Sequence, residues 1–118
     1  MKIPKFEAQT EWVKPTEFPD LRQVEEIAID LETKDPDLIK KGSGSVIGNG
    51  EVIGIAVATK HYKGYFPIAH EGGGNMDRSR VLSWLKDILE APSTKIFHNA
   101  IYDVCWLRAM GFKINGDI

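Results

Sequence analysis

The apolar residues of this chain follow two different spacings, and the change between them restricts the fold more than any other feature. Between Val24 and Leu31 they alternate, which is typical of a strand with one face in a core. Over residues 78–90 they recur at i, i+3 and i+4, which gives a helix one buried face. Because the strand period comes first and the helix period follows, the chain is predicted to form an α/β domain.

The remaining elements extend this order. "EVIGIAVAT" and "YKGYFPIAH" are two more β-type runs, predicted to pair as a meander, and Asp77 is predicted to cap the helix over 78–90. "TKIFHN" predicts a short buried strand, after which Asn99 caps a second helix over 100–110 that Gly111 ends. "FKINGDI" predicts the start of a further strand. The predicted fold is a mixed sheet with the order β-β-β-α-β-α-β, incomplete at its C-terminus.

The N-terminal part differs from the rest. Residues 1–20 contain Pro4, Pro15 and Pro19 and show no period, so we expect an extended arm. Residues 21–118 are expected to form the folded unit, since a chain of 118 residues holds one hydrophobic core. "KDPDLIKKGSGSVIGNG", rich in Gly and Lys, predicts a loop.

Charge and cysteine content limit the setting. A net charge of −2 argues against broad electrostatic wrapping of nucleic acid, but it allows a small site that reaches phosphates through bound metal. The single cysteine, Cys105, excludes an internal disulfide and fits a reducing compartment. The N-terminus has no apolar signal region, and no run approaches membrane-spanning length. We therefore expect a cytoplasmic protein without a membrane segment.

Two acids stand together at the end of the first strand, in "AIDLETKDP". Residues i and i+2 of a strand face the same side, with Cα atoms roughly 6.5 Å apart, so Asp30 and Glu32 project together. Unpaired, they would repel each other and raise one pKa. A pair of divalent cations would remove that conflict and would also suit phosphodiester hydrolysis. The alternative is that both acids only solubilise a strand end, and so short a pattern taken alone favours that interpretation.

A second acid-bearing segment is "HNAIYDVCWL". Asn99 stands at a strand-to-helix junction, and Asp103 lies in the first turn, where a carboxylate benefits from the helix dipole. A plain cap and a plain first-turn acid account for both residues without any function. They do not explain why the acid is flanked by Tyr102, Val104 and Trp106, which is an apolar setting for a solvated side chain.

Together the two segments point to a family. "DLET" after one strand and "HNAIYD" after a later one resemble the Exo I and Exo II motifs of the DEDD superfamily of 3′→5′ exonucleases, which have a ribonuclease H-like fold. The stretches "VIGIAVA", "GYFPIAHEGGGN" and "VLSWLKDIL" make the chain most similar to the proofreading domain of family A DNA polymerases, of phage or bacterial type. The resemblance covers residues 24–110 in the expected order. It implies a domain that removes nucleotides from a single-stranded or frayed DNA 3′ end, with a polymerase domain in the parent chain.

The resemblance also implies roles for the acids. Asp30 would bridge two divalent metal ions, Mg²⁺ or Mn²⁺, which hard carboxylate oxygens suit. Glu32 would ligate the ion that activates the attacking water, and Asp103 would hold the second ion through water.

Four other residues receive substrate roles by the same resemblance. Thr33 would contact the terminal nucleotide, and His98 and Asn99 would lie beside the scissile end of the strand. Tyr102 is assigned to the substrate or, equally, to the core. Some relatives have a lysine at the Ile101 position, so one phosphate contact is expected to be absent here.

The sequence departs from the family pattern in one respect. The superfamily uses a fourth carboxylate, in an Exo III motif that carries a Tyr or a His, and Asp117 comes too early to supply it. We therefore expect a truncated domain that alone binds Mg²⁺ weakly, has negligible nuclease activity and self-associates through an exposed apolar strip. An RNA-trimming exonuclease of the same superfamily and a non-catalytic, nucleic-acid-binding or structural remnant of the domain remain alternatives.

Overall fold

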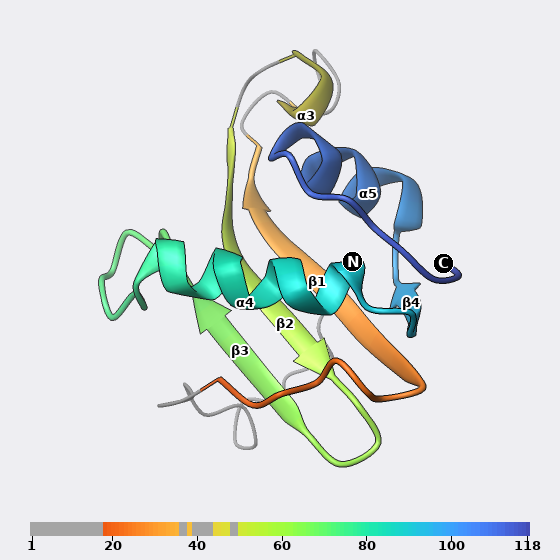
Figure 1. The fold of residues 1–118 in the computed structure, drawn as a ribbon. Coiled ribbons are helices and arrows are strands. Elements are labelled where there is room, and N and C mark those ends of the chain that lie inside the picture. The colour runs from red at the N-terminus through yellow and green to blue at the C-terminus, as the bar shows by residue number, and fades with distance from the viewer. Residues whose placement is uncertain (1–17, 36–37, 39–43, 48–49) are drawn as a thin grey trace.

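The computed structural model describes residues 18–35, 38, 44–47 and 50–118. In chain order, its strands and helices are β1 (Glu26–Lys34), α3 (Gly44–Ile47), β2 (Glu51–Ala58), β3 (Lys63–Pro67), α4 (Arg78–Glu90), β4 (Thr94–Phe97) and α5 (Ala100–Ala109). Strands and helices alternate in the second half of the chain, as an α/β domain requires (Figure 1).

The four strands form one mixed sheet in the order β3-β2-β1-β4. β2 runs antiparallel to both β1 and β3, whereas β4 runs parallel to β1, from the pair Glu26 and Thr94 to the pair Ile29 and Phe97. The chain reaches β4 from β3 through α4, because a parallel neighbour requires a crossover connection. The predicted α/β class with a mixed sheet is confirmed, and it is compatible with a ribonuclease H-like fold.

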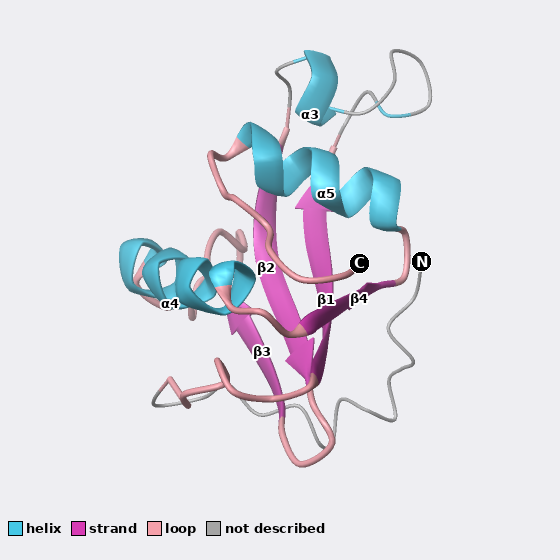
Figure 2. Ribbon diagram, turned by 45° about the vertical axis from the view of Figure 1, so that its right-hand side comes forward, coloured by secondary structure: helices cyan, strands magenta, loops and turns pink. Residues whose placement is uncertain are grey.

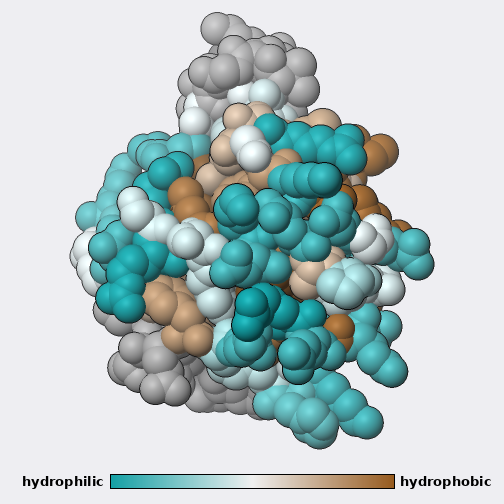
Figure 3. All heavy atoms as spheres, in the orientation of Figure 1, coloured by the Kyte–Doolittle hydropathy of each residue, from teal (hydrophilic) through white to brown (hydrophobic). Residues whose placement is uncertain are grey.

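One face of the sheet carries the core. α4 crosses this face, and α5 lies over the end of β1 (Figures 1 and 2). Alternate residues of β1 are buried, and they pack with the inner sides of both helices and with Phe66 of β3. The central buried side chains are Ile27, Ile29, Leu31, Ile55, Val57, Val81, Leu85, Leu89 and Leu107. The outer surface of the helical layer is mainly hydrophilic (Figure 3).

Both predicted helix starts are confirmed. Asp77 accepts a hydrogen bond from the backbone N–H of Arg80, and Asn99 accepts one from that of Tyr102, so each caps its helix. At the end of α5, Gly111 adopts φ +95°, where a residue with a side chain would be strained. None of the described helices has the length and apolar character needed to cross a bilayer.

Two predicted segments differ from the structure. The residues "FKINGDI" do not form a strand, because their backbone makes no regular hydrogen-bond ladder with β4. Asn115 N–H donates to Leu89 O, and the bond from β4 to this segment is that of Lys95 N–H to Asp117 O. The last β element of the predicted order is therefore wrong. The predicted loop before β2 contains a short helix, α3, whose first amide donates to the Asp35 carboxylate at 2.9 and 3.1 Å.

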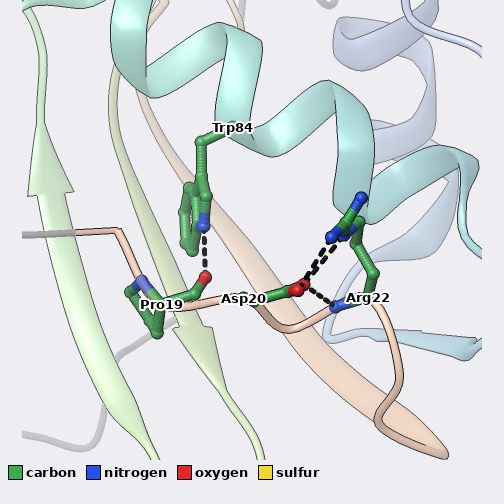
Figure 4. Close-up of polar contacts among 4 residues, drawn as sticks. All are labelled: Pro19, Asp20, Arg22 and Trp84. Atoms are coloured by element: carbon green, nitrogen blue, oxygen red, sulfur yellow. Dashed lines mark hydrogen bonds and ion pairs between the residues drawn. The ribbon is translucent and has the colours of Figure 1, made fainter.

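Three described residues of the predicted N-terminal arm lie against the folded unit. Phe18 stacks on Phe66 with a centroid distance of 5.8 Å, and the indole N–H of Trp84 donates to Pro19 O at 2.7 Å. Asp20 and Arg22 form a bidentate pair beside them (Figure 4). The rest of the predicted arm, residues 1–17, lies outside the described residues.

The face of the sheet opposite the helices carries the other set of β1 side chains, among them Ala28, Asp30 and Glu32. At its lower end, Ala28, Ala58 and Ile96 line a groove together with charged residues of neighbouring loops. Ile96 is 46% exposed there. The expected self-association of the chain through an apolar strip stays a prediction.

Candidate active site at the end of β1

The candidate site lies where β4 stops alongside β1. β4 pairs with β1 only as far as Ile29, and α5 begins soon afterwards, beside the part of β1 that β4 no longer covers. Asp103 of α5 lies at this uncovered edge of β1, where its carboxylate accepts a hydrogen bond from the backbone of Leu31. The parallel pairing and the start of α5 thus bring an acid of the second motif to the strand of the first motif.

Asp103 is the most perturbed acid of the site. Its side chain is 2% exposed, and burial raises its pKa to about 7, with the nearby charge of Asp30 as the second cause. Its Oδ2 atom is buried without any hydrogen-bond partner. A buried carboxylate oxygen without a partner is costly, so this atom needs a proton or a cation.

Asp30 is half-buried on the opposite face of the sheet from the core. Its pKa is raised, first by burial and also by the charge of Glu32, while His98 acts in the opposite direction. The charge of Asp30 in turn raises the pKa of Asp103, so the two side chains lie near each other. A carboxylate whose charge raises the pKa of a neighbouring carboxylate marks an electron-rich position that would gain from a cation.

Glu32 lies on the same face as Asp30 but is bonded to other groups. Tyr65 Oη donates to Glu32 Oε1 at 2.5 Å, and His70 Nε2 lies 3.6 Å from the same oxygen. Within the described ranges, no group of three or more His, Cys, Asp or Glu side chains is arranged to hold a metal ion. The structure thus brings Asp30 and Asp103 together and turns Glu32 toward β3.

Thr33 and Tyr102, both predicted to contact substrate, contact each other. Their hydroxyl oxygens lie 2.8 Å apart, and Tyr102 Oη donates to Asp35 Oδ2 at 2.7 Å. The Tyr102 hydroxyl has one proton, so it accepts from Thr33. Of the two roles assigned to Tyr102, the packing one accounts for these contacts, because the ring is half-buried against the core.

His98 and Asn99 lie in the exposed turn between β4 and α5. His98 is near enough to Asp30 to affect its pKa. Asn99 Oδ1 is 3.4 Å from the Tyr102 amide, which is the cap geometry. Ile101, next to them, is 82% exposed.

Sequence reasoning missed Tyr65 and His70. Both come from the run "GYFPIAH", which was predicted to form a strand and contributed to the family resemblance but received no site residue. The signal that could have identified them is the alternation in β3, since Tyr65 projects to the same face as the acids. Its direction toward Glu32 depends on strand register, which the sequence did not give.

Comparisons with known proteins add a relationship. No protein-family model matches the chain. The chain is 41% identical over 114 residues to a DNA-directed DNA polymerase of Pseudomonas phage M6. The similarity covers 88% of this chain but only 16% of that polymerase. The chain is therefore related to one segment of a phage DNA polymerase.

Proposed function

We propose that this chain is a 3′→5′ exonuclease domain that acts with a DNA polymerase and trims a single-stranded or frayed DNA 3′ end. The observation that carries the proposal is that Asp30 and Asp103, from two distant motifs, lie near each other while Asp103 Oδ2 has no hydrogen-bond partner. A purely structural Asp103 accounts for the hydrogen bond from the Leu31 backbone, but not for the second carboxylate oxygen, which is buried without a partner. The similarity to a phage DNA polymerase supports a replicative setting, and with it the cytoplasm of a host cell.

The residues present fit a divalent cation. The Asp103 oxygen lacks a partner, both aspartates resist ionisation, and oxygen ligands of this kind suit Mg²⁺ or Mn²⁺. Asp30 and Asp103 would hold the cation, and Glu32 would contribute an oxygen from the same face. A bound pair of such ions would supply the electrostatic stabilisation and the activated water of phosphodiester hydrolysis.

The other side chains of the site would handle the nucleic acid. His98 lies near Asp30, and Asn99 and Ile101, which follow closely in the chain, are exposed. Thr33 would reach a terminal nucleotide through its backbone, because its hydroxyl already donates to Tyr102.

A non-catalytic module is the second candidate. The absence of a three-ligand group among the described residues favours it, as does the engagement of Glu32 by Tyr65. The two candidates differ in one measurable property, which is cation-dependent hydrolysis.

The test is a nuclease assay of the full-length protein that carries this sequence, on 5′-labelled single-stranded DNA with Mg²⁺. We expect successive shortening from the 3′ end, and we expect Asp30→Ala to lower the rate by orders of magnitude without unfolding the protein. Glu26→Ala is the matched control, because it removes an exposed acid from the same face of β1. A folded Asp30→Ala variant with a near-normal rate would overturn the proposal. Preferential digestion of RNA of the same sequence would identify the RNA-trimming alternative.

A further inference from the structure

We propose that Tyr65 and His70 are positioning residues that hold the Glu32 carboxylate by one oxygen and leave the other for a cation. This inference rests on the proposed function, since it presumes that Glu32 serves a cation. Neither residue belongs to the acidic motifs, and they reach the site from the other side of β2.

The contacts define a directed chain of hydrogen bonds. Tyr65 Oη donates its only proton to Glu32 Oε1 at 2.5 Å. The same hydroxyl oxygen contacts His70 Nε2, so it accepts a proton that His70 carries on that nitrogen. The two rings meet edge to face at a centroid distance of 5.6 Å. Glu32 is therefore fixed by a phenol whose own direction is fixed by an imidazole.

Gly54 makes this arrangement possible. Glu32 pairs with Gly54 across β1 and β2, and Tyr65 stands on the far strand, so its ring has to pass over β2. A Cβ atom at Gly54 would lie 1.8 Å from Tyr65 Oη and 2.4 Å from its Cζ. A glycine inside a strand often marks such a close approach. Because Gly54 has no side chain, the Tyr65 ring has the space to reach Glu32.

The loop after β3 holds His70 in place. His70 N–H donates to Asn75 Oδ1 at 2.8 Å, and Asn75 Nδ2 returns a bond to His70 O at 3.0 Å. The neighbouring Glu71 pairs with Lys34 at the end of β1. Hydrogen bonds within this loop and an ion pair to β1, the strand that carries Glu32, therefore hold the loop in place.

The consequence concerns the ligand geometry of Glu32. With Oε1 engaged by Tyr65, only Oε2 is left to meet a cation. Groups that orient a metal ligand typically change metal affinity or activity about 10- to 100-fold when removed. We therefore expect loss of the Tyr65 hydroxyl to weaken cation binding about tenfold while the fold stays intact.

The experiment uses Mn²⁺ as the probe and has two measurements: Mn²⁺ binding by the full-length protein that carries this sequence, and proton NMR of the 118-residue chain. Mn²⁺ affinity is measured by electron paramagnetic resonance for the wild type, Tyr65→Phe, His70→Gln, His70→Leu and Asp30→Asn. Tyr62→Phe is the control, because it removes a hydroxyl from the residue that immediately precedes β3. His70→Gln keeps an N–H donor, so it should retain more affinity than His70→Leu. Proton NMR separately detects the hydrogen-bonded Tyr65 hydroxyl, which should vanish in Glu32→Ala and persist in Asp30→Asn.

The outcomes separate the two proposals. Unchanged affinity in Tyr65→Phe, while Asp30→Asn abolishes binding, overturns the positioning role and leaves the proposed function standing. Absence of the hydroxyl signal in the wild type also overturns the positioning role. A present hydroxyl signal with no Asp30-dependent Mn²⁺ binding overturns the proposed function, and the positioning role falls with it. A tenfold loss in Tyr65→Phe, little change in Tyr62→Phe and partial retention in His70→Gln support the inference.

Discussion

The Tyr102 hydroxyl lies 2.8 Å from Thr33 Oγ1 and donates to Asp35 Oδ2, so one phenol fastens α5 to the end of β1. Tyr102→Phe keeps the ring but removes the hydroxyl, so Thr33 and Asp35 each lose a hydrogen bond. With each hydrogen bond worth about 1 kcal/mol, we expect unfolding in urea to show a loss of about 1–2 kcal/mol. If the stability were unchanged while DNA binding weakened, the substrate role of Tyr102 would be the correct one.

Burial of Asp103 makes stability depend on pH. Its pKa is about 7 in the folded state against 3.8 as the ordinary value, so between these pH values the folded chain holds a proton that the unfolded chain has lost. The free energy of unfolding should therefore fall as pH rises through this window, by at most about 1.4 kcal/mol per pH unit, and then level off. Urea titrations in the presence of a chelator, at pH values across this window, measure the slope.

The matched variant for this prediction is Asp103→Asn, which has no charge to bury. It should be more stable than the wild type above neutral pH and should lose most of the slope. An unchanged slope would assign the pH dependence to other groups. Mg²⁺ should stabilise the wild type above neutral pH, since cation binding requires deprotonated ligands.

Asn99 caps α5, and its loss should be visible in stability. Asn99→Ala should cost roughly 1 kcal/mol, because the Tyr102 amide loses its acceptor, whereas Asn99→Asp should retain the cap. Under the proposed function, Asn99→Ala should also lower cleavage per folded molecule. Unchanged cleavage per folded molecule would make Asn99 a cap and nothing more.

Gly54→Ala tests the space beneath Tyr65. A Cβ there forces the ring away, and overpacking of this kind costs about 1–3 kcal/mol. In a Tyr65→Ala background the same substitution should cost much less, so a double-mutant cycle should give a coupling energy. Gly72→Ala is the control, since a Cβ at Gly72 would meet no atom within 4 Å. Equal costs in both backgrounds would contradict the steric argument.

Lys95 is fully buried, and its ammonium donates to three carbonyl oxygens, of Ala91, Ser93 and Asn115. Lys95→Met keeps most of the stem but leaves these oxygens without a donor, and one unsatisfied buried group costs about 1–3 kcal/mol. We expect a loss of at least that size in chemical denaturation. Lys86→Met, at an exposed position of α4, should change little, and equal effects of the two substitutions would refute the prediction.

The sequence predicted the elements best where pattern and cap agree. α4 has its predicted bounds because its apolar period is regular and Asp77 marks its start. "FKINGDI" alternates like a strand, but strand formation needs an available sheet edge. β4 offers such an edge, but this segment bonds to it only through Lys95 N–H, and its Asn115 N–H donates to Leu89 O instead, so alternation misled the prediction there.

The site was predictable only in part, for a related reason. The shared side of Asp30 and Glu32 follows from strand geometry, and the nearness of Asp103 follows from motif order. The Tyr65 contact depends on the register of three strands and on the absence of a side chain at Gly54, which no local pattern encodes. The role of Lys95 likewise depends on three segments that meet only in the folded chain.

The parallel pairing of β1 with β4 also has a kinetic consequence. Strands β2 and β3 are close in sequence and can pair early, whereas Glu26 has to find Thr94 across most of the described chain. Contacts between distant residues slow folding, because the loop entropy is lost before the contact is gained. Asp103 follows β4 in the chain, so its contact with Leu31 is likewise one between distant residues. During synthesis on the ribosome, the acids of the two motifs therefore cannot come together until α5 has emerged.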